Sequence, residues 1–127
     1  MDLIKATILL VEDDPAILKL LEYIFKKEYS VVLAINGKDA LEKISEHKPD
    51  LIISDIMMPR MDGYETLTKL KNDPETMNIP FIFLTSVQSP ASKRLSRELG
   101  ASNYILKPFK AKEFLEVINM QIIPNLK

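Results

Sequence analysis

The sequence predicts an α/β protein built on a single parallel sheet, and three observations lead to this prediction. Short apolar runs alternate with segments of helical periodicity along all 127 residues. Continuous apolar runs are typical of strands buried on both faces, as in a parallel sheet covered by helices. Parallel strands also end at one edge, where ligands bind. Four runs end at polar residues: residues 8–11 at Glu12, 51–54 at Asp55, 81–84 at Thr85 and 104–106 at Lys107.

The first half of the chain predicts two strand–helix units and a third strand. Asp14 and Pro15 mark a helix start, because Asp is a favoured cap and Pro is favoured at the first helical position. The buried stripe of this helix follows at helical spacing: Ile17, Leu18, Leu21, Ile24 and Phe25. A second strand is predicted at residues 31–35, ended by the turn signal Asn36-Gly37. The next helix carries Ala40, Leu41 and Ile44 and ends near Lys48-Pro49.

The second half continues the alternation. The third strand leads through Asp55 into a loop and a helix that extends past residue 70. Ser89-Pro90 predicts the start of the fourth helix, and Gly100 predicts its C-cap. The fifth helix is predicted from about residue 111 to 123, with a buried face: Phe114, Leu115, Ile118 and Ile122. We therefore expect five strands and five helices in one domain.

Composition excludes several function classes. Hydrophobic residues make up 46% and charged residues 28%, and the net charge is -1. No global field therefore recruits nucleic acid or an anionic membrane. The absence of cysteine excludes disulfides, a thiol nucleophile and thiolate metal sites. No apolar stretch has the length of a membrane span, and the N-terminus lacks the pattern of a signal peptide. The expected location is the cytoplasm.

An acidic cluster follows the first predicted strand. Glu12, Asp13 and Asp14 crowd negative charge at one strand end, and Asp55 is expected to point toward them from a nearby strand. Carboxylates within about 4–6 Å repel, so one takes up a proton unless a cation lies between them. Oxygen ligands without His or Cys suit Mg²⁺. The pattern therefore favours a magnesium site, with Asp14 serving instead as the helix cap.

Asp55 is the candidate nucleophile. A carboxylate can attack phosphorus to give an acyl phosphate, and the approach of two anions requires a metal and an ammonium to neutralise charge. Lys107 would supply the ammonium, and Thr85 a hydroxyl that hydrogen-bonds a phosphoryl oxygen. Each residue alone has an ordinary explanation, as a cap, a solvated lysine or a β-former. Their joint occurrence at strand ends favours phosphoryl chemistry.

Two other features have structural explanations. His47, the only histidine, lies in a polar helix end, so we expect it to be exposed rather than a phosphotransfer residue. Met57, Met58 and Met61 cluster in one loop, where gap-filling packing explains them better than a ligand role.

Five motifs occur along the chain in a fixed order: Val11-Glu12-Asp13-Asp14, the segment 54–63 from Ser54-Asp55 to Asp62-Gly63, Leu84-Thr85-Ser86, Gly100-Ala101 and Tyr104-Ile105-Leu106-Lys107-Pro108-Phe109. With these motifs the chain resembles the receiver domain of two-component response regulators, including the chemotaxis-Y type. The resemblance covers essentially the whole chain and implies a flavodoxin-like (βα)5 fold with strand order 2-1-3-4-5.

The resemblance also implies roles for individual residues at the metal site. Asp55 is the implied phospho-acceptor. Asp13 is the implied direct Mg²⁺ ligand, and Glu12 acts mainly through metal-bound water. The backbone carbonyl of Met57 completes the protein ligands, two residues beyond the nucleophile.

Further roles concern the phosphoryl group and the response to it. Lys107 is implied to bind the phosphoryl group, and the Lys107-Pro108 bond is implied to be cis. Thr85 and Tyr104 resemble the family's switch pair. Phosphorylation draws the threonine hydroxyl toward the phosphate, and the tyrosine ring turns inward into the vacated space.

The implied function is a phosphorylation switch with only weak self-catalysed phosphotransfer and autodephosphorylation. The expected donor is a histidine kinase or a histidine phosphotransfer protein. The expected output is a downstream protein or a fused output domain, contacted through the fourth helix, fifth strand and fifth helix. Residues 1–127 are expected to form one receiver domain with no output domain. Neither nucleic acid nor a membrane is expected as a direct partner.

Three other functions are compatible with a parallel α/β sheet. An aspartate-nucleophile phosphatase carries an acid/base Asp two residues past the nucleophile, where this chain has Met57. A flavin-binding module needs a phosphate loop after the first strand, where Glu12, Asp13 and Asp14 would repel a phosphate. A phosphorylation-independent interaction scaffold would not need Glu12, Asp55 and Lys107. It stays the alternative to the phosphorylation switch.

Departures from the family's pattern carry information as well. Many members have two acidic residues where this chain has Ser102-Asn103, and the last helix contains no arginine. Both differences disfavour the dimer by which some relatives bind DNA. In the family, the side chains at the positions of Met57 and Val87 overlook the phosphate and influence how water reaches it. Here both side chains are apolar and offer water no hydrogen-bonding partner. We therefore hypothesise slow spontaneous dephosphorylation.

Overall fold

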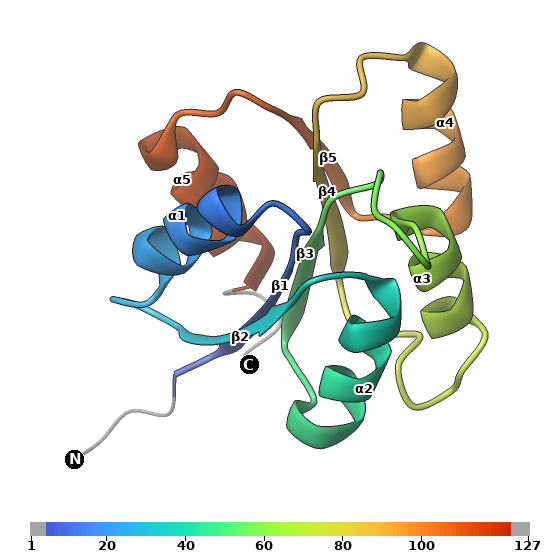
Figure 1. Ribbon diagram of the computed structural model, residues 1–127, viewed down its shortest axis with the longest axis horizontal. Coiled ribbons are helices and arrows are strands. Elements are labelled where there is room, and N and C mark those ends of the chain that lie inside the picture. The colour runs from blue at the N-terminus through green and yellow to red at the C-terminus, as the bar shows by residue number, and fades with distance from the viewer. Residues whose placement is uncertain (1–4, 123–127) are drawn as a thin grey trace.

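The computed structural model describes residues 5–122, which form a parallel five-stranded sheet with flanking helices (Figure 1). The strand order is β2-β1-β3-β4-β5, which confirms the predicted flavodoxin-like topology. The strands are β1 Thr7–Val11, β2 Ser30–Ala34, β3 Leu51–Ser54, β4 Phe81–Thr85 and β5 Asn103–Leu106. The helices are α1 Pro15–Phe25, α2 Gly37–His47, α3 Gly63–Lys71, α4 Pro90–Leu99 and α5 Ala111–Ile122.

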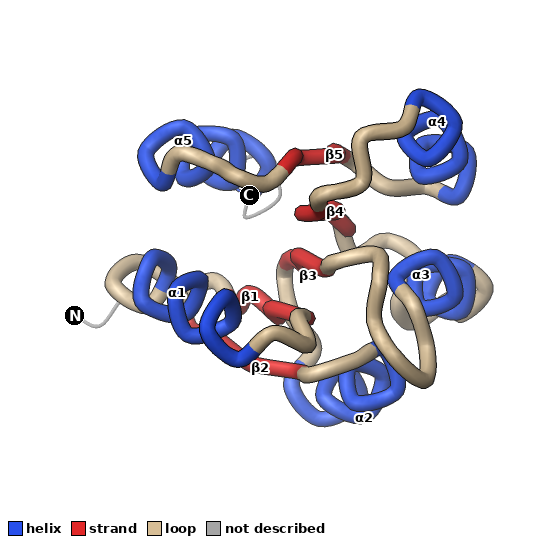
Figure 2. The backbone as a smooth tube through the Cα atoms, turned by 45° about the horizontal axis from the view of Figure 1, so that its top comes forward, coloured by secondary structure: helices blue, strands red, loops and turns tan. Residues whose placement is uncertain are grey.

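Helices cover both faces of the sheet. Helices α1 and α5 lie on one face, and α2, α3 and α4 lie on the other (Figure 2). Side chains alternate between these faces along each strand. Ile8 and Leu10 of β1 pack toward α1 and α5, in the cluster that contains Phe25 and Phe114. Leu9 of β1 packs in the second cluster, with residues of α2 and α3.

The second strand and the following turn differ in detail from the prediction. The strand predicted at 31–35 occupies Ser30–Ala34, one residue earlier. Asn36-Gly37, predicted as a turn signal that ends the strand, begins α2 directly. The side-chain oxygen of Asn36 accepts the Asp39 N–H at 2.8 Å, so this asparagine satisfies an amide that the helix leaves free. Periodicity alone does not distinguish a turn from a cap.

Other helix boundaries agree with the predictions. Asp14 caps α1, because its carboxylate accepts the Ala16 N–H at 2.9 Å. Ser89 caps α4, and Gly100 ends it with a φ of 108°, a conformation that favours glycine. The predicted end of the last helix at residue 123 lies outside the described residues. Within residues 5–122, no helix is long and apolar enough to cross a membrane.

Candidate functional site

The register of the sheet brings two acidic strand ends together. Val11 of β1 pairs with Ser54 of β3, so Glu12 and Asp55 follow side by side at the carboxyl edge. Glu12, Asp13 and Asp55 each place a carboxylate oxygen within 4.8 Å of the others. The sequence predicted this proximity from the strand ends alone. We call these three residues together with Lys107 the charged site.

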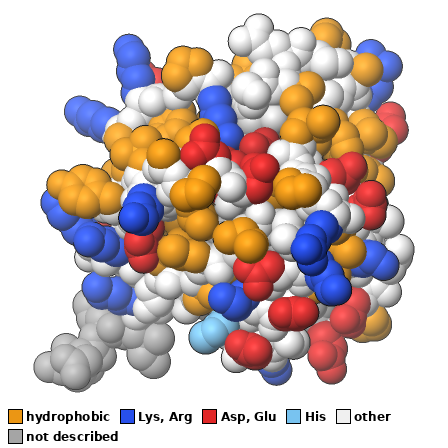
Figure 3. Space-filling model, viewed as in Figure 1, with side chains coloured by type: hydrophobic (Ala, Val, Ile, Leu, Met, Phe, Trp, Pro, Cys, Tyr) orange, Lys and Arg blue, Asp and Glu red, His pale blue; other side chains and the backbone are white. Residues whose placement is uncertain are grey.

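Burial differs sharply among the three carboxylates. Glu12 is 2% exposed, whereas Asp13 is exposed and Asp55 is intermediate. Burial raises the pKa of Glu12 above its usual value of 4.5, the hydrogen bond from Lys107 opposes this rise, and the charge of Asp55 adds to it. Acidic side chains gather near the middle of the face in Figure 3, with apolar side chains on either side.

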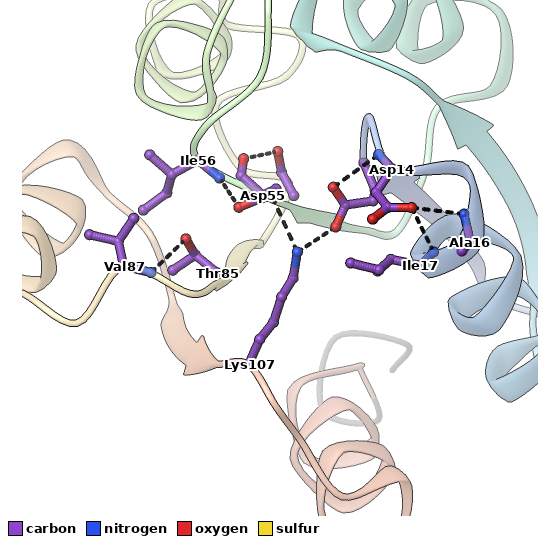
Figure 4. A network of polar contacts seen from close by, with 10 residues as sticks. Asp14, Ala16, Ile17, Asp55, Ile56, Thr85, Val87 and Lys107 are labelled. Carbon is purple, nitrogen blue, oxygen red and sulfur yellow. Dashed lines mark hydrogen bonds and ion pairs between the residues drawn. The ribbon is translucent and has the colours of Figure 1, made fainter.

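Lys107 connects the two buried strand ends. It follows Leu106 of β5, which pairs with Thr85 of β4. Its Nζ donates to Glu12 Oε1 at 2.5 Å and to Asp55 Oδ2 at 3.2 Å (Figure 4). Burial alone lowers the pKa of Lys107, but the two carboxylates outweigh it, and the pKa lies above its usual value of 10.5. The ammonium is therefore charged and partly balances the acidic cluster.

The backbone around Lys107 and the cap residue Asp14 also follow the sequence analysis. The Lys107-Pro108 peptide bond is cis. The Asp14 side chain serves the start of α1, and the group of possible metal-binding carboxylates among the described residues is Glu12, Asp13 and Asp55. Capping and cation binding are thus divided between adjacent acidic residues.

The donor chemistry of the charged site fits Mg²⁺. The cluster offers carboxylate oxygens from Glu12, Asp13 and Asp55, and Mg²⁺ is usually held by one or two carboxylates together with waters and phosphate oxygens. The exposed Asp13 faces solvent, from which waters would complete the coordination. The backbone carbonyl of Met57, the fourth predicted ligand, stays a prediction.

Backbone groups fix the orientation of Asp55. Its Oδ1 accepts the Ile56 N–H at 2.7 Å, and its own N–H donates to the Val11 carbonyl at 3.0 Å. The start of α3 presses close behind it, because a Cβ on Gly63 would lie 2.4 Å from the Asp55 carbonyl oxygen. Glycine at this position allows the close approach. One carboxylate oxygen thus meets an amide and the other meets Lys107.

Thr85 hydrogen-bonds, through its hydroxyl, the backbone of the loop that follows β4. It is fully buried at the end of β4, and its Oγ1 accepts the Val87 N–H at 3.2 Å (Figure 4). The hydroxyl therefore contacts the β4–α4 loop. Since it accepts in that bond, its own proton is available for donation.

Tyr104 lies on the edge strand β5 and points toward the same loop. Its hydroxyl donates to the Val87 carbonyl at 2.7 Å, and its ring packs edge-on against Phe83, with centroids 6.4 Å apart. The backbone of Val87 thus contacts both predicted switch residues, Thr85 through N–H and Tyr104 through C=O.

The exposure of Met57, Met58 and His47 tests the structural explanations that the sequence analysis gave for them. Met58 is 9% exposed and packs in the core, as predicted, but Met57 is 67% exposed. Packing therefore explains Met58 and does not explain Met57. The side chain of His47 is 49% exposed, in agreement with the expected solvent exposure.

Sequence reasoning missed contacts made by backbone and by neutral hydroxyls. The Ile56 N–H that holds Asp55 is a backbone group, so the identity of the side chain does not predict this hydrogen bond. Tyr64 and Ser92, 28 residues apart, hydrogen-bond each other through their hydroxyls, and no motif signals such a pair. The only available signal was their positions on adjacent predicted helices.

The fold and the charged site together define a class: single-sheet α/β proteins with an oxygen-only acidic cluster and a lysine at the carboxyl edge. Residues 8–119 match the family model of the response regulator receiver domain. The chain belongs to this family.

Relatives with known names occur in several protein contexts. The chain is 44% identical over 110 residues to Histidine kinase P4 of Formosa agariphila, covering 87% of this chain and 8% of that kinase. It is 36% identical over 116 residues to Protein PilG of Pseudomonas aeruginosa, covering 91% of this chain and 86% of PilG. The chain thus spans a small part of one relative and most of another.

Solved structures agree with the fold. The BeF3-activated receiver domain of Klebsiella pneumoniae RstA has a TM-score of 0.85 and 36% identity, with 92% of this chain and 98% of that chain covered. As in the family generally, this chain is a receiver domain of two-component signalling.

Proposed function

We propose that the protein is a phosphorylation switch that accepts a phosphoryl group on Asp55 from a histidine kinase or a histidine phosphotransfer protein. The observation that carries this proposal is the position of Asp55, between a carboxylate cluster suited to a cation and the ammonium of Lys107. In the transfer, the Asp55 carboxylate attacks phosphorus, a P–O bond forms, and the P–N bond to the donor histidine breaks.

Each neighbour of Asp55 has a part in this step. Mg²⁺, when bound to Glu12, Asp13 and Asp55, supplies positive charge against the two approaching anions. Lys107 neutralises a phosphoryl oxygen, and the Ile56 N–H keeps the carboxylate oriented. The residue two positions beyond the nucleophile is Met57, which cannot act as acid or base. The protein is therefore a phospho-acceptor with slow self-catalysis rather than a turnover enzyme.

The donor's docking site is proposed to be an apolar groove beside the charged site. The groove has a volume of about 620 Å³, and Lys107 forms part of its wall. On its α1 side, Leu20 is 50% exposed and Tyr23 is 60% exposed. A protein seated on these side chains would present its histidine next to Asp55. We expect Leu20→Asp to slow transfer from a phosphorylated histidine phosphotransfer protein, with an unchanged rate from a small phosphodonor; equal rates from both donors would contradict this docking site.

Output is proposed to pass through the face formed by α4, β5 and α5 to a partner protein or a fused output domain. Tyr104 on β5 would report the state of Thr85 to this face, because the Val87 backbone contacts both residues. Residues 1–127 would act as one receiver unit in this scheme.

A mass measurement tests the central proposal. The protein is incubated with Mg²⁺ and acetyl phosphate, and the expected result is a gain of one phosphoryl group that is absent in Asp55→Asn. Asp14→Asn is the matched control, since it makes the same charge change at the same sheet edge and asparagine also caps a helix. It should keep the adduct. Wild-type protein without an adduct from acetyl phosphate or phosphoramidate would favour the phosphorylation-independent scaffold instead.

A further inference from the structure

Tyr104 is held by a chain of hydroxyl groups that extends into α4 and α3. The Ser92 Oγ lies 3.0 Å from the Tyr104 hydroxyl, and the Tyr64 hydroxyl hydrogen-bonds Ser92 in turn. Tyr64 belongs to α3, Ser92 to α4 and Tyr104 to β5, so three elements meet here. We call Tyr64, Ser92 and Tyr104, with the Val87 carbonyl that ends the series, the hydroxyl chain.

The direction of donation in the hydroxyl chain follows from its last acceptor. A carbonyl oxygen only accepts, so the Tyr104 hydroxyl donates its single proton to Val87. The Tyr104 oxygen can then only accept from Ser92, and Ser92 accepts from Tyr64. Removing the hydroxyl of Tyr64 removes the terminal donor, whereas removing that of Ser92 disconnects Tyr104 from both helices.

Packing places the same side chains in fixed positions. The Phe83 ring packs edge-on against Tyr64, with centroids 5.7 Å apart, and against Tyr104 at 6.4 Å. Ser92 is only 9% exposed. A buried hydroxyl without a partner costs free energy, so Ser92 favours the ring position in which Tyr104 reaches it. Figure 2 shows α3 and α4 side by side on the face of the sheet where this happens.

We propose that Tyr64 and Ser92 are positioning residues for Tyr104, which hold its ring inward before phosphorylation and make α3 part of the switch. The inference rests on the proposed function in one respect, the assignment of Tyr104 as the switch tyrosine. Thr85 and Tyr104 contact the Val87 backbone from opposite ends. A phosphoryl group that attracts the Thr85 hydroxyl therefore acts, through Val87, on the Tyr104 ring, whose inward position α3 and α4 already favour.

The first experiment uses no phosphodonor and reads the Tyr104 ring directly. Nuclear Overhauser contacts between the rings of Tyr104 and Phe83 are measured in wild type, Tyr64→Phe and Ser92→Ala. We expect both variants to weaken these contacts, Ser92→Ala more strongly, and Ser92→Thr to restore them because it keeps a hydroxyl. Ser45→Ala, the same change as Ser92→Ala at an exposed position of α2, should leave them unchanged.

The second experiment measures the affinity for beryllofluoride in the presence of Mg²⁺, as a phosphoryl analogue. Coupling is reciprocal, so a variant that lowers the inward population should bind the analogue more weakly. The loss of one hydrogen bond predicts a decrease of about threefold to tenfold. A merely structural role would lower thermal stability and leave this affinity unchanged.

The two readouts separate the inference from the proposed function. Ring contacts in Tyr64→Phe and Ser92→Ala that match wild type would overturn the positioning role. Weakened contacts with an unchanged analogue affinity would overturn the link to the switch. If wild-type protein binds no beryllofluoride, the proposed function fails, while the ring contacts still decide whether α3 and α4 position Tyr104.

Discussion

The charged site at the carboxyl edge of the sheet and the hydroxyl chain beneath α3 and α4 are built from opposite chemistry. The charged site contains three carboxylates and an ammonium, with Glu12 almost fully buried. The hydroxyl chain contains neutral groups only. Hydrogen bonds to charged groups contribute about 1.5–3 kcal/mol, and neutral ones about 0.5–1.5 kcal/mol. A region proposed to receive an anion needs strong fixed charge, whereas a region proposed to change conformation needs contacts weak enough to exchange.

The largest expected effect concerns the charge of Lys107. Lys107→Met removes the ammonium that contacts Glu12 and Asp55, and we expect phosphorylation by acetyl phosphate to slow by about 100-fold, the usual loss for one electrostatic donor. A time course of adduct mass measures the rate. Lys110→Met, which removes an exposed lysine of the same loop, should have no effect. A Lys107→Met rate within twofold of wild type would show that the ammonium does not contribute to phosphoryl transfer at the charged site.

The second prediction uses pH to separate the two regions. The pKa of Glu12 lies above 4.5 in the folded protein, so a proton competes with Mg²⁺ until the pH exceeds this raised pKa. Affinity for Mg²⁺ should therefore increase as pH rises toward this raised pKa, by up to about tenfold per pH unit for each proton displaced, and level off above it. Glu12→Gln should reduce this dependence in a calorimetric titration.

The hydroxyl chain provides the contrast, because it contains no carboxyl, imidazole or amino group. Contacts between the rings of Tyr104 and Phe83 should stay constant over the same pH range, as measured by nuclear Overhauser spectra. A ring position that follows the titration of Glu12 would mean that the two regions are coupled without phosphorylation.

A third, smaller effect is expected on the rate of dephosphorylation, from the apolar side chains of Met57 and Val87. Met57 is exposed beside Asp55, and Val87 contacts Thr85 and Tyr104 through its backbone. Neither side chain can hydrogen-bond an attacking water. We therefore expect the double variant Met57→Asn with Val87→Glu to lose its phosphoryl group several times faster than wild type, in a phosphate-release time course. Faster release from wild type would show that apolar side chains here do not protect the phosphoryl group.

The smallest effect concerns the loop that connects Asp55 with α3. Arg60 has a φ of 70°, a conformation that favours glycine. Arg60→Gly relieves this penalty but increases the entropy of the unfolded chain, for an expected net gain of about 0.5 kcal/mol in the free energy of unfolding by urea. Lys48→Gly, at the other non-glycine residue with positive φ among residues 5–122, is a matched variant. Destabilisation by Arg60→Gly alone would mean that the arginine side chain supports the loop.

The charged site was predictable because it depends on strand ends and sheet type. Continuous apolar runs indicated parallel strands, and parallel strands place Glu12, Asp55 and Lys107 at one edge whatever the detailed packing. The fold class followed from the same alternation, whereas the strand order came from a family resemblance.

The hydroxyl chain was not predictable in the same way. The contact of Ser92 with Tyr64 depends on how α3 and α4 rotate about their axes, and periodicity does not fix that rotation to within the length of a hydrogen bond. The same limitation explains why the contact of the Thr85 hydroxyl with the Val87 N–H was not predicted. Asn36 was interpreted as a turn because caps and turns favour the same residues.

The ion pair between Lys107 and Glu12 has a consequence for biosynthesis. These residues are 95 positions apart, and Lys107 follows the last strand of the sheet. While the ribosome is still making β4, the emerging chain already contains the acidic cluster but not its counter-charge. The emerging chain therefore lacks the ammonium proposed to assist Asp55, and only the arrival of Lys107, directly after β5, adds a balancing positive charge to the repelling carboxylates.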